Sequence, residues 1–154
     1  MTLVVEIPGR GRLELEYVLL DVNGTLSDRG ELLDGVASRL AALGERLELR
    51  LVSGDTFETL DAIGAELGVP ATRVADGMRK LELVEELGRD RCVVVGNGTN
   101  DALALEAAAL GIAIVGPEGA SAAAVRSADV LCSSVVEALE LLLEPRALVA
   151  TLRL

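Results

Sequence analysis

The amino-acid sequence predicts an α/β fold, a Rossmann-like doubly wound parallel sheet with helices on both faces. Short apolar runs alternate with helical patterns of about ten residues, which is typical of parallel sheets whose strands are joined by helices. The runs 17–20 and 92–95 are apolar throughout, as in strands that are buried on both faces. The 154 residues contain no internal repeat, low-complexity tract or linker, so a single domain over residues 1–154 is expected.

Turn and cap residues divide the N-terminal half into its elements. It is expected to contain a strand pair at 3–7 and 13–17, a buried strand at 17–20, a polar turn at 27–30 that forms a short flap, a helix from Asp34 to about Ala42, a strand at 47–52 and a helix at 57–67. Asp34 is a typical N-cap, and Val36, Leu40 and Leu43 lie on one face of the helix that follows. Gly68 is expected to end the second helix.

The C-terminal half continues the alternation of strands and helices. It is expected to contain a strand at 72–75, a helix at 79–87, a strand at 92–95, a helix at 101–110, a strand at 112–115, a helix at 120–127, a strand at 129–132, a helix at 135–143 and a tail at 145–154. Gly88 and Gly111 stand where two of these helices are expected to end.

Composition excludes several classes of function. The net charge is −11 and no segment is strongly basic, which argues against nucleic acid as a partner. The longest apolar runs are too short to span a bilayer, and the N-terminus has no signal-peptide pattern. We therefore expect a cytoplasmic protein without a membrane partner.

The supply of metal ligands is equally restrictive. The chain has no histidine, which excludes a Ser-His-Asp triad, a histidine general base and a histidine-ligated metal. A metal would have to be held by oxygen atoms, which favours Mg²⁺ over Zn²⁺. Cys92 and Cys132 both lie in expected strands, and two small buried hydrophobic residues are favoured over a disulfide or a redox pair.

Four segments carry unusual chemistry at the carboxyl ends of expected strands or near a helix start, and parallel strands bring these ends to one edge. They are Asp21–Leu26, Ser53–Asp55, Lys80 and Asn97–Asp101. Asp21 alone would be consistent with a turn cap, but a carboxylate in apolar surroundings favours a cation or a reaction. Lys80 is the only lysine among 14 basic residues, which suggests that a compact ammonium is needed there, although one lysine has to fall somewhere.

Together these segments resemble the haloacid dehalogenase superfamily, and most closely the soluble relatives of the P-type ATPase phosphorylation domain. DVNGTL at 21–26 resembles the DKTGTL of those ATPases, and LVSGD at 51–55 resembles their LTGD. Lys80, with Val84 and Leu87, is similar to the K-x-x-x-V-x-x-L around the family's lysine. GNGTNDALAL at 96–105 resembles GDGVNDAPAL, with one Asp replaced by Asn.

The resemblance implies a Mg²⁺-dependent phosphohydrolase or phosphotransferase in which Asp21 accepts the phosphoryl group as an aspartyl phosphate. By this resemblance, the metal ligands would be Asp21 and the main-chain carbonyl of Asn23, together with Asn97 or Asp101. The phosphoryl oxygens would be held by Ser53 and the Gly54 amide, with Asn23 beside them. Lys80 would neutralise Asp21 and the phosphate, and Thr25 and Asn100 would support the loops. Asp101 also stands where a helix N-cap is expected, and the two roles are compatible.

Two positions depart from the phosphatases of the superfamily. Those enzymes usually carry Asp where this chain has Asn23, and an amide cannot transfer the proton that a leaving group needs. Losing a general acid typically costs about 10²–10⁴ in rate, most for alkyl esters and least for anhydrides and acyl phosphates. Asn97 replaces a metal-binding Asp and removes one negative charge, from which weak Mg²⁺ affinity is expected.

The stretches from Leu26 to the first helix and from Asp55 to Lys80 are too short for a cap domain. A capless site suggests either a macromolecular substrate or a homo-oligomer whose neighbouring subunits cover the site. The expected partner is a phosphorylated small molecule or a phosphoprotein. An alternative is a non-catalytic or regulatory module that binds metal and phosphate without efficient turnover. A structural domain with coincidental motifs would need four coincidences in order.

Overall fold

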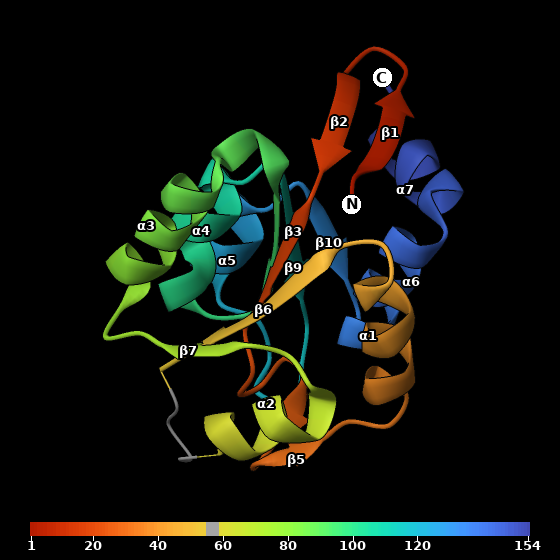
Figure 1. Cartoon of the computed structure of the whole chain (residues 1–154). Coiled ribbons are helices and arrows are strands. Elements are labelled where there is room, and N and C mark those ends of the chain that lie inside the picture. Colours follow the sequence, from red (N-terminus) through yellow and green to blue (C-terminus); the bar gives the residue numbers. More distant parts are fainter. Residues whose placement is uncertain (55–58) are drawn as a thin grey trace.

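The structure, a computed structural model, describes residues 1–54 and 59–154 and is built around one sheet. The sheet has six strands, and each neighbouring pair is parallel. In spatial order its strands are β10 (Val130–Cys132), β9 (Leu110–Ile114), β8 (Cys92–Gly96), β3 (Tyr17–Leu20), β6 (Glu48–Ser53) and β7 (Ala71–Arg73). The central position of β3, between β8 and β6, confirms the predicted doubly wound parallel sheet (Figure 1).

Helices cover both faces of the sheet, as predicted (Figure 1). One face carries α1 (Val36–Gly44), α2 (Leu60–Leu67), α6 (Val135–Leu143) and α7 (Pro145–Leu152), and the other carries α3 (Gly77–Leu87), α4 (Ala102–Ala107) and α5 (Ala122–Ser127). Side chains of β3 alternate between the two layers, because Val18 and Leu20 join the first apolar cluster and Leu19 joins the second. Both layers are therefore fixed to the strand that leads into Asp21.

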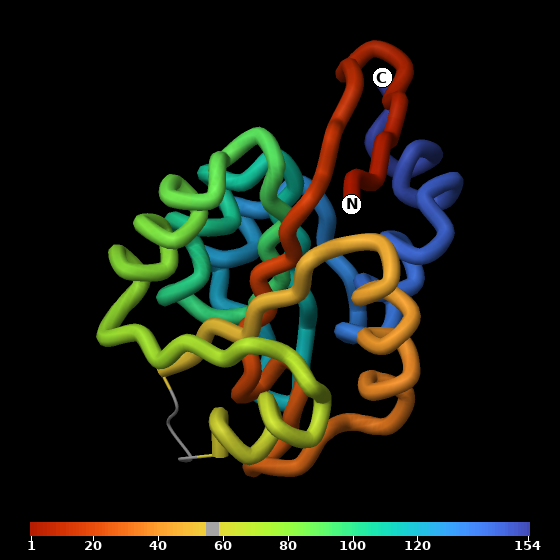
Figure 2. Tube along the Cα trace, in the orientation of Figure 1, coloured from red at the N-terminus to blue at the C-terminus, as the bar shows by residue number. Residues whose placement is uncertain are grey.

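Two small hairpins accompany the sheet. The predicted N-terminal strand pair is antiparallel and consists of β1 (Leu3–Ile7) and β2 (Gly11–Leu15). This hairpin and the flap lie at opposite ends of the molecule (Figure 2). The predicted flap is formed by β4 (Ser27–Asp28) and β5 (Glu31–Leu32). Arg29 and Gly30 both have positive φ, 51° and 87°, as the two central residues of a type I′ hairpin turn do. Two 3₁₀ turns, Arg89–Arg91 and Thr99–Asp101, precede β8 and α4.

The start of α1 differs from the prediction. Gly35 rather than Asp34 is the N-cap, with a left-handed φ of 81°, and no side chain caps the helix. The flap brings the chain into α1 through a conformation that favours glycine, which sequence patterns for polar caps do not detect. Val36, Leu40 and Leu43 are buried on one face of α1, as predicted. The predicted helix at 57–67 is observed from Leu60, and its residues 57–58 lie outside the described part of the chain.

Two predictions for the C-terminal half differ most from the structure. The helix expected at 101–110 ends at Ala107, because Leu110 already belongs to the fully buried strand β9. The expected tail 145–154 forms α7, in which Pro145 occupies the first turn, where a missing N–H is tolerated. Leu148 and Leu152 of α7 are buried against the first apolar cluster. Cys92 and Cys132 are buried free thiols, as predicted.

None of the helices in residues 1–54 and 59–154 is long and apolar enough to cross a bilayer.

The docking of α7 leads to a stability prediction. Leu148→Ala is expected to lower the free energy of unfolding by about 2–5 kcal/mol, because it leaves a cavity at a fully buried position. Urea denaturation followed by circular dichroism measures the change. Leu154→Ala removes the same atoms at a side chain that is 94% exposed and serves as the control. Equal stability of the two variants would contradict the packing of α7 on the core.

Candidate active site

The carboxyl ends of β3, β6, β8 and β9 border one cavity of about 390 Å³. The described residues that line it come from the segments 21–23, 53–54, 97–100 and 118–121. Three of these segments are the strand-end motifs identified in the sequence, and the fourth is the turn after β9. The rule that parallel strands place their ligand site at the carboxyl edge therefore holds here.

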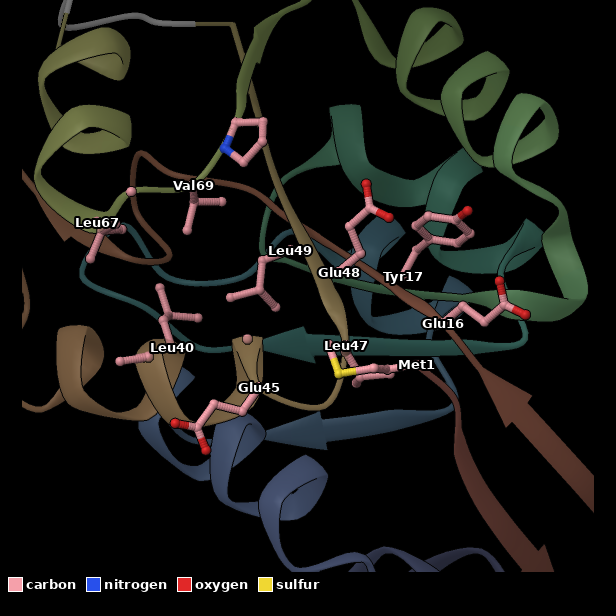
Figure 3. Close-up of a pocket in the computed structure, with 14 residues that line it drawn as sticks. Met1, Glu16, Tyr17, Leu40, Glu45, Leu47, Glu48, Leu49, Leu67 and Val69 are labelled. Atoms are coloured by element: carbon pink, nitrogen blue, oxygen red, sulfur yellow. The ribbon is translucent and has the colours of Figure 1, made fainter.

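A larger hollow of about 620 Å³ lies at the opposite edge of the sheet, where Tyr17 begins β3 and Glu48 begins β6 (Figure 3). Leucine side chains from α1, α2 and β6 form much of its wall. Two of its carboxylates already have partners, since Glu16 pairs with Arg91 at 2.9 Å and Glu48 pairs with Arg50. It contains none of the motif residues, so the smaller cavity is the candidate active site.

A buried ion cluster forms the floor of the candidate active site. The Lys80 Nζ atom donates to Asp21 Oδ1 at 2.9 Å and to Asp101 Oδ1 at 2.6 Å. All three side chains are at least nine-tenths buried. Lys80 lies 59 positions from Asp21 and 21 from Asp101 in the sequence, so only the folded chain brings the three charges together.

The position of Lys80 follows from the start of α3. Asp76 caps this helix by accepting a hydrogen bond from the Arg79 amide at 3.1 Å. Gly77 allows the first turn to approach the Asn100 backbone, because a Cβ at residue 77 would lie 2.7 Å from the Asn100 carbonyl oxygen. Lys80 follows on the first turn of α3 and is thereby brought beside the two carboxylates.

Asp101 closes the loop after β8 as well as bonding to Lys80. Its Oδ2 atom accepts hydrogen bonds from the amides of Asn97 at 3.1 Å and Gly98 at 3.0 Å. Its side chain accepts none from the first turn of α4, so the predicted side-chain cap of that helix is absent from the described residues. Both Asp101 oxygens are already engaged, and this side chain acts as an anchor between the loop and α3.

Thr25 and Asn97 hold the other side of Asp21. The Thr25 hydroxyl lies 3.0 Å from Asp21 Oδ2 and 3.2 Å from Asn97 Oδ1, and its one proton serves one of these acceptors at a time. The Asn97 amide nitrogen donates to the Gly119 carbonyl at 3.0 Å. Asp21 therefore has a donor on each oxygen, Lys80 on one side and Thr25 on the other, which fixes its orientation.

The remaining predicted site residues also reach the cavity. Asn23, Ser53, Gly54 and Asn100 all line it, and Ser53 is buried. The Asn23 Oδ1 atom is buried and has no hydrogen-bond partner within the described part of the chain, which is costly unless a ligand supplies one. Asp55, the last residue of the LVSGD motif, lies outside the described residues.

Burial and charge shift the pKa values of the cluster. Burial, followed by the charge of Asp101, raises the pKa of Asp21 to about 6, while Lys80 acts in the opposite direction. Burial alone would lower the pKa of Lys80, but the two aspartates outweigh it and raise this pKa above its usual value. At neutral pH the three side chains therefore carry one buried net negative charge.

The donors that face the cavity are oxygen atoms. Residues 1–54 and 59–154 contain no cluster of three or more Asp, Glu, Cys or His side chains arranged to hold a metal ion. The Asp21 carboxylate, the Asn23 Oδ1 atom and the Asn97 Oδ1 atom are nevertheless side-chain oxygens of residues that line one space. Oxygen ligands of this kind, one of them without a partner, suit a hard divalent cation.

Sequence reasoning missed one acidic residue of the site, Glu118. It lies in the turn after β9 and lines the cavity, where its Oε2 atom sits against the backbone of Gly24. A Cβ at Gly24 would lie 2.1 Å from that oxygen, and Gly24 has a positive φ of 75°. The carboxyl-edge rule applied to the predicted strand 112–115 would have drawn attention to this turn.

Comparison with known proteins identifies the class. A family model described as haloacid dehalogenase-like hydrolase matches residues 5–109. The chain belongs to this family. Among curated proteins, the uncharacterized protein MJ0073 of Methanocaldococcus jannaschii is 37% identical over 83 residues, which cover 51% of this chain and 89% of that protein.

Solved structures of phosphatases share the fold. The 3-deoxy-D-manno-octulosonate 8-phosphate phosphatase from Moraxella catarrhalis, in complex with magnesium, phosphate and KDO, is 21% identical with a TM-score of 0.69, over 89% of this chain and 92% of that one. The cobalt-bound deoxy-D-mannose-octulosonate 8-phosphate phosphatase from Haemophilus influenzae is 16% identical with a TM-score of 0.70, over 86% of this chain and 90% of that one. A phospho-aspartyl intermediate analogue of phosphoserine phosphatase is 16% identical with a TM-score of 0.68, over 82% of this chain and 98% of that one. At these identities the likeness concerns the fold.

The raised pKa of Asp21 leads to a prediction about stability in metal-free buffer. The folded protein binds the Asp21 proton more tightly than the unfolded chain, so ionising this group costs stability as pH rises from about 4 to about 6. Asp21→Asn removes the charge and keeps the shape, and is expected to stabilise the protein by about 1–3 kcal/mol at pH 7.5. The gain should disappear near pH 4.

Thermal unfolding of the wild type and Asp21→Asn across this pH range measures the difference. Asp90→Asn is the matched control, because Asp90 is an exposed aspartate in the turn before β8. A stabilisation that does not depend on pH would contradict the assignment to Asp21 ionisation.

Proposed function

We propose that this protein is a Mg²⁺-dependent phosphohydrolase or phosphotransferase that forms an aspartyl phosphate on Asp21. The observation that carries the proposal is the Lys80 ammonium between Asp21 and Asp101, beneath a cavity that Asp21, Ser53 and Asn97 line. Membership of the haloacid dehalogenase-like hydrolases supports it. The phosphatases that share the fold, with magnesium, cobalt or a phospho-aspartyl analogue in their structures, support it further.

The metal would be held by the Asp21 carboxylate, the main-chain carbonyl of Asn23 and the side-chain oxygen of Asn97. The unpartnered Asn23 Oδ1 atom supports a ligand at this place, since a buried acceptor without a donor is otherwise unfavourable. Asp101 fits a supporting role better than a direct one, because it is not among the described residues that line the cavity and its Oδ2 atom already accepts two main-chain hydrogen bonds. A bound divalent cation would neutralise the charge of the phosphoryl group.

Asp21 is the nucleophile of the proposed reaction. A bond forms between an Asp21 carboxylate oxygen and phosphorus, and the bond to the leaving-group oxygen breaks with its electron pair on that oxygen. Lys80 and Thr25 hold the carboxylate in one orientation, so little reorganisation is needed at the moment of attack. Ser53 and Gly54 line the cavity, and the Ser53 hydroxyl and the Gly54 amide would bind phosphoryl oxygens in the proposed reaction. Water then attacks phosphorus, the bond between phosphorus and the Asp21 oxygen breaks with its electron pair on the carboxylate, and the proton lost by the water passes to the released phosphate.

The side chain of Asn23 limits the range of substrates. Asn23 lines the same cavity as Asp21, but its neutral amide cannot transfer a proton to an alkoxide leaving group. Acyl phosphates and anhydrides, whose leaving groups are stable anions, are therefore the preferred classes. The described residues add only the β4–β5 flap between β3 and α1, so a phosphorylated metabolite or a phosphoprotein has open access.

The first test uses acetyl phosphate and p-nitrophenyl phosphate with Mg²⁺. We expect turnover of acetyl phosphate, slower turnover of the ester, and a loss of at least about 10³-fold in Asp21→Asn. Asp90→Asn should keep the wild-type rate. Measurable turnover that is unchanged in Asp21→Asn would contradict the phosphoenzyme, and absence of turnover together with no thermal shift from beryllofluoride and Mg²⁺ would contradict the pocket itself.

A second test separates an incomplete catalyst from a regulatory module. Asn23→Asp restores a group that can transfer a proton, and is expected to raise p-nitrophenyl phosphate hydrolysis by about 10²-fold or more while changing acetyl phosphate hydrolysis little. Steady-state kinetics on both substrates measure the effect. Binding of beryllofluoride without turnover in either protein would instead favour a module that binds metal and phosphate without efficient catalysis.

A further inference from the structure

We propose that Glu118 supplies the second carboxylate of the cation site and takes over the charge that position 97 lacks. This inference rests on the proposed function, because it concerns how the same site would hold a divalent ion. Asp21 and Glu118 are the two carboxylate side chains among the described residues that line the cavity. Glu118 has no hydrogen-bond or ion-pair partner in the described part of the chain, so its carboxylate is available to a cation.

The turn that carries Glu118 places this exposed side chain over the loop after β3. Gly116 and Gly119 bond to each other through both amides, at 3.2 and 2.9 Å, which leaves Pro117 and Glu118 at the corner. Gly116 lies directly against the Gly24 backbone, since a Cβ on Gly116 would come within 1.9 Å of the Gly24 carbonyl oxygen. Glu118 Oε2 also reaches Gly24, where no Cβ blocks it.

Asn97 connects this turn to the centre of the site. Its side-chain nitrogen donates to the Gly119 carbonyl at 3.0 Å, and its own carbonyl accepts from the Ser121 amide at 2.8 Å. A carboxylate at position 97 would face the Gly119 carbonyl oxygen without a proton to share. The amide of Asn97 therefore fixes the turn that carries Glu118. Asparagine in place of aspartate at position 97 removes one negative charge from the site, and it also positions the Glu118 carboxylate that supplies another.

The charge count supports this exchange. Asp21, Asp101 and Lys80 together carry −1, and Glu118 brings the total around the cavity to −2, which matches a divalent cation. An aspartate at position 97 would give the same total without Glu118. The weak Mg²⁺ affinity expected from Asn97 alone should therefore not be observed in the wild type.

The test measures Mg²⁺ binding directly, by isothermal titration calorimetry on the full chain without substrate. Glu118→Gln keeps the size of the side chain, removes its charge and is expected to weaken Mg²⁺ binding by about tenfold or more. Glu106→Gln, at an exposed position on α4, makes the same change in net charge and should stay within about twofold of the wild type. Asn97→Asp combined with Glu118→Gln should restore most of the lost affinity.

The outcomes separate this inference from the proposed function. Wild-type binding of Mg²⁺ with equal affinity in Glu118→Gln and Glu106→Gln would overturn the role of Glu118 and leave the phosphoenzyme proposal intact. Unchanged Mg²⁺ affinity with a reduced kcat and an altered pH profile in Glu118→Gln would also overturn it, because Glu118 would then transfer protons. A wild type that binds neither Mg²⁺ nor beryllofluoride would overturn both proposals.

Discussion

The contact of one buried ammonium with two buried carboxylates is the interaction on which the candidate site depends. Lys80 comes from α3, Asp21 follows β3 and Asp101 follows β8, so the cluster joins the helix layer that contains α3 to the centre of the sheet. Removing the Lys80 ammonium would leave two like charges buried without a counterion, which is strongly unfavourable, whereas removing one carboxylate charge leaves a neutral ion pair. Two close backbone approaches make the contact possible: Gly77 against Asn100, and Gly96, where a Cβ would lie 2.4 Å from the Asp101 carboxyl carbon.

Much of this arrangement could be predicted from the sequence because it follows from rules of local pattern. Continuous apolar runs identified the central strands β3 and β8, and parallel connection then placed Asp21 and Asn97 at the same edge. The structure brings Asn23, Ser53 and Asn97 to one cavity with Asp21 and places Lys80 beneath it. The assignment of nucleophile, phosphate and metal roles to these residues stays a prediction.

The rest could not be predicted because it depends on contacts between segments that are distant in the sequence. Gly35 begins α1 only because the flap turns the chain into a left-handed conformation there. The helix α7 follows Pro145 and is stabilised by burial of Leu148 and Leu152, which no local pattern for a tail reveals. For Glu118 the carboxyl-edge rule would have drawn attention to the turn, but the position of its side chain depends on the contact of that turn with Gly24 and Asn97.

The two asparagines have different consequences for the proposed chemistry. At position 97 the amide makes two contacts that an aspartate could not both make, one to Thr25 and one to Gly119, so the exchange has a structural compensation nearby. At position 23 the side-chain oxygen has no hydrogen-bond partner among residues 1–54 and 59–154. No contact of Asn23 with another described residue supplies the transferable proton that an aspartic acid would carry there. Charge can be returned from another loop, whereas a proton donor must lie within hydrogen-bond reach of the leaving group. Under the proposed function, the site is therefore expected to suit phosphoryl groups on leaving groups that depart as anions better than alkyl phosphate esters.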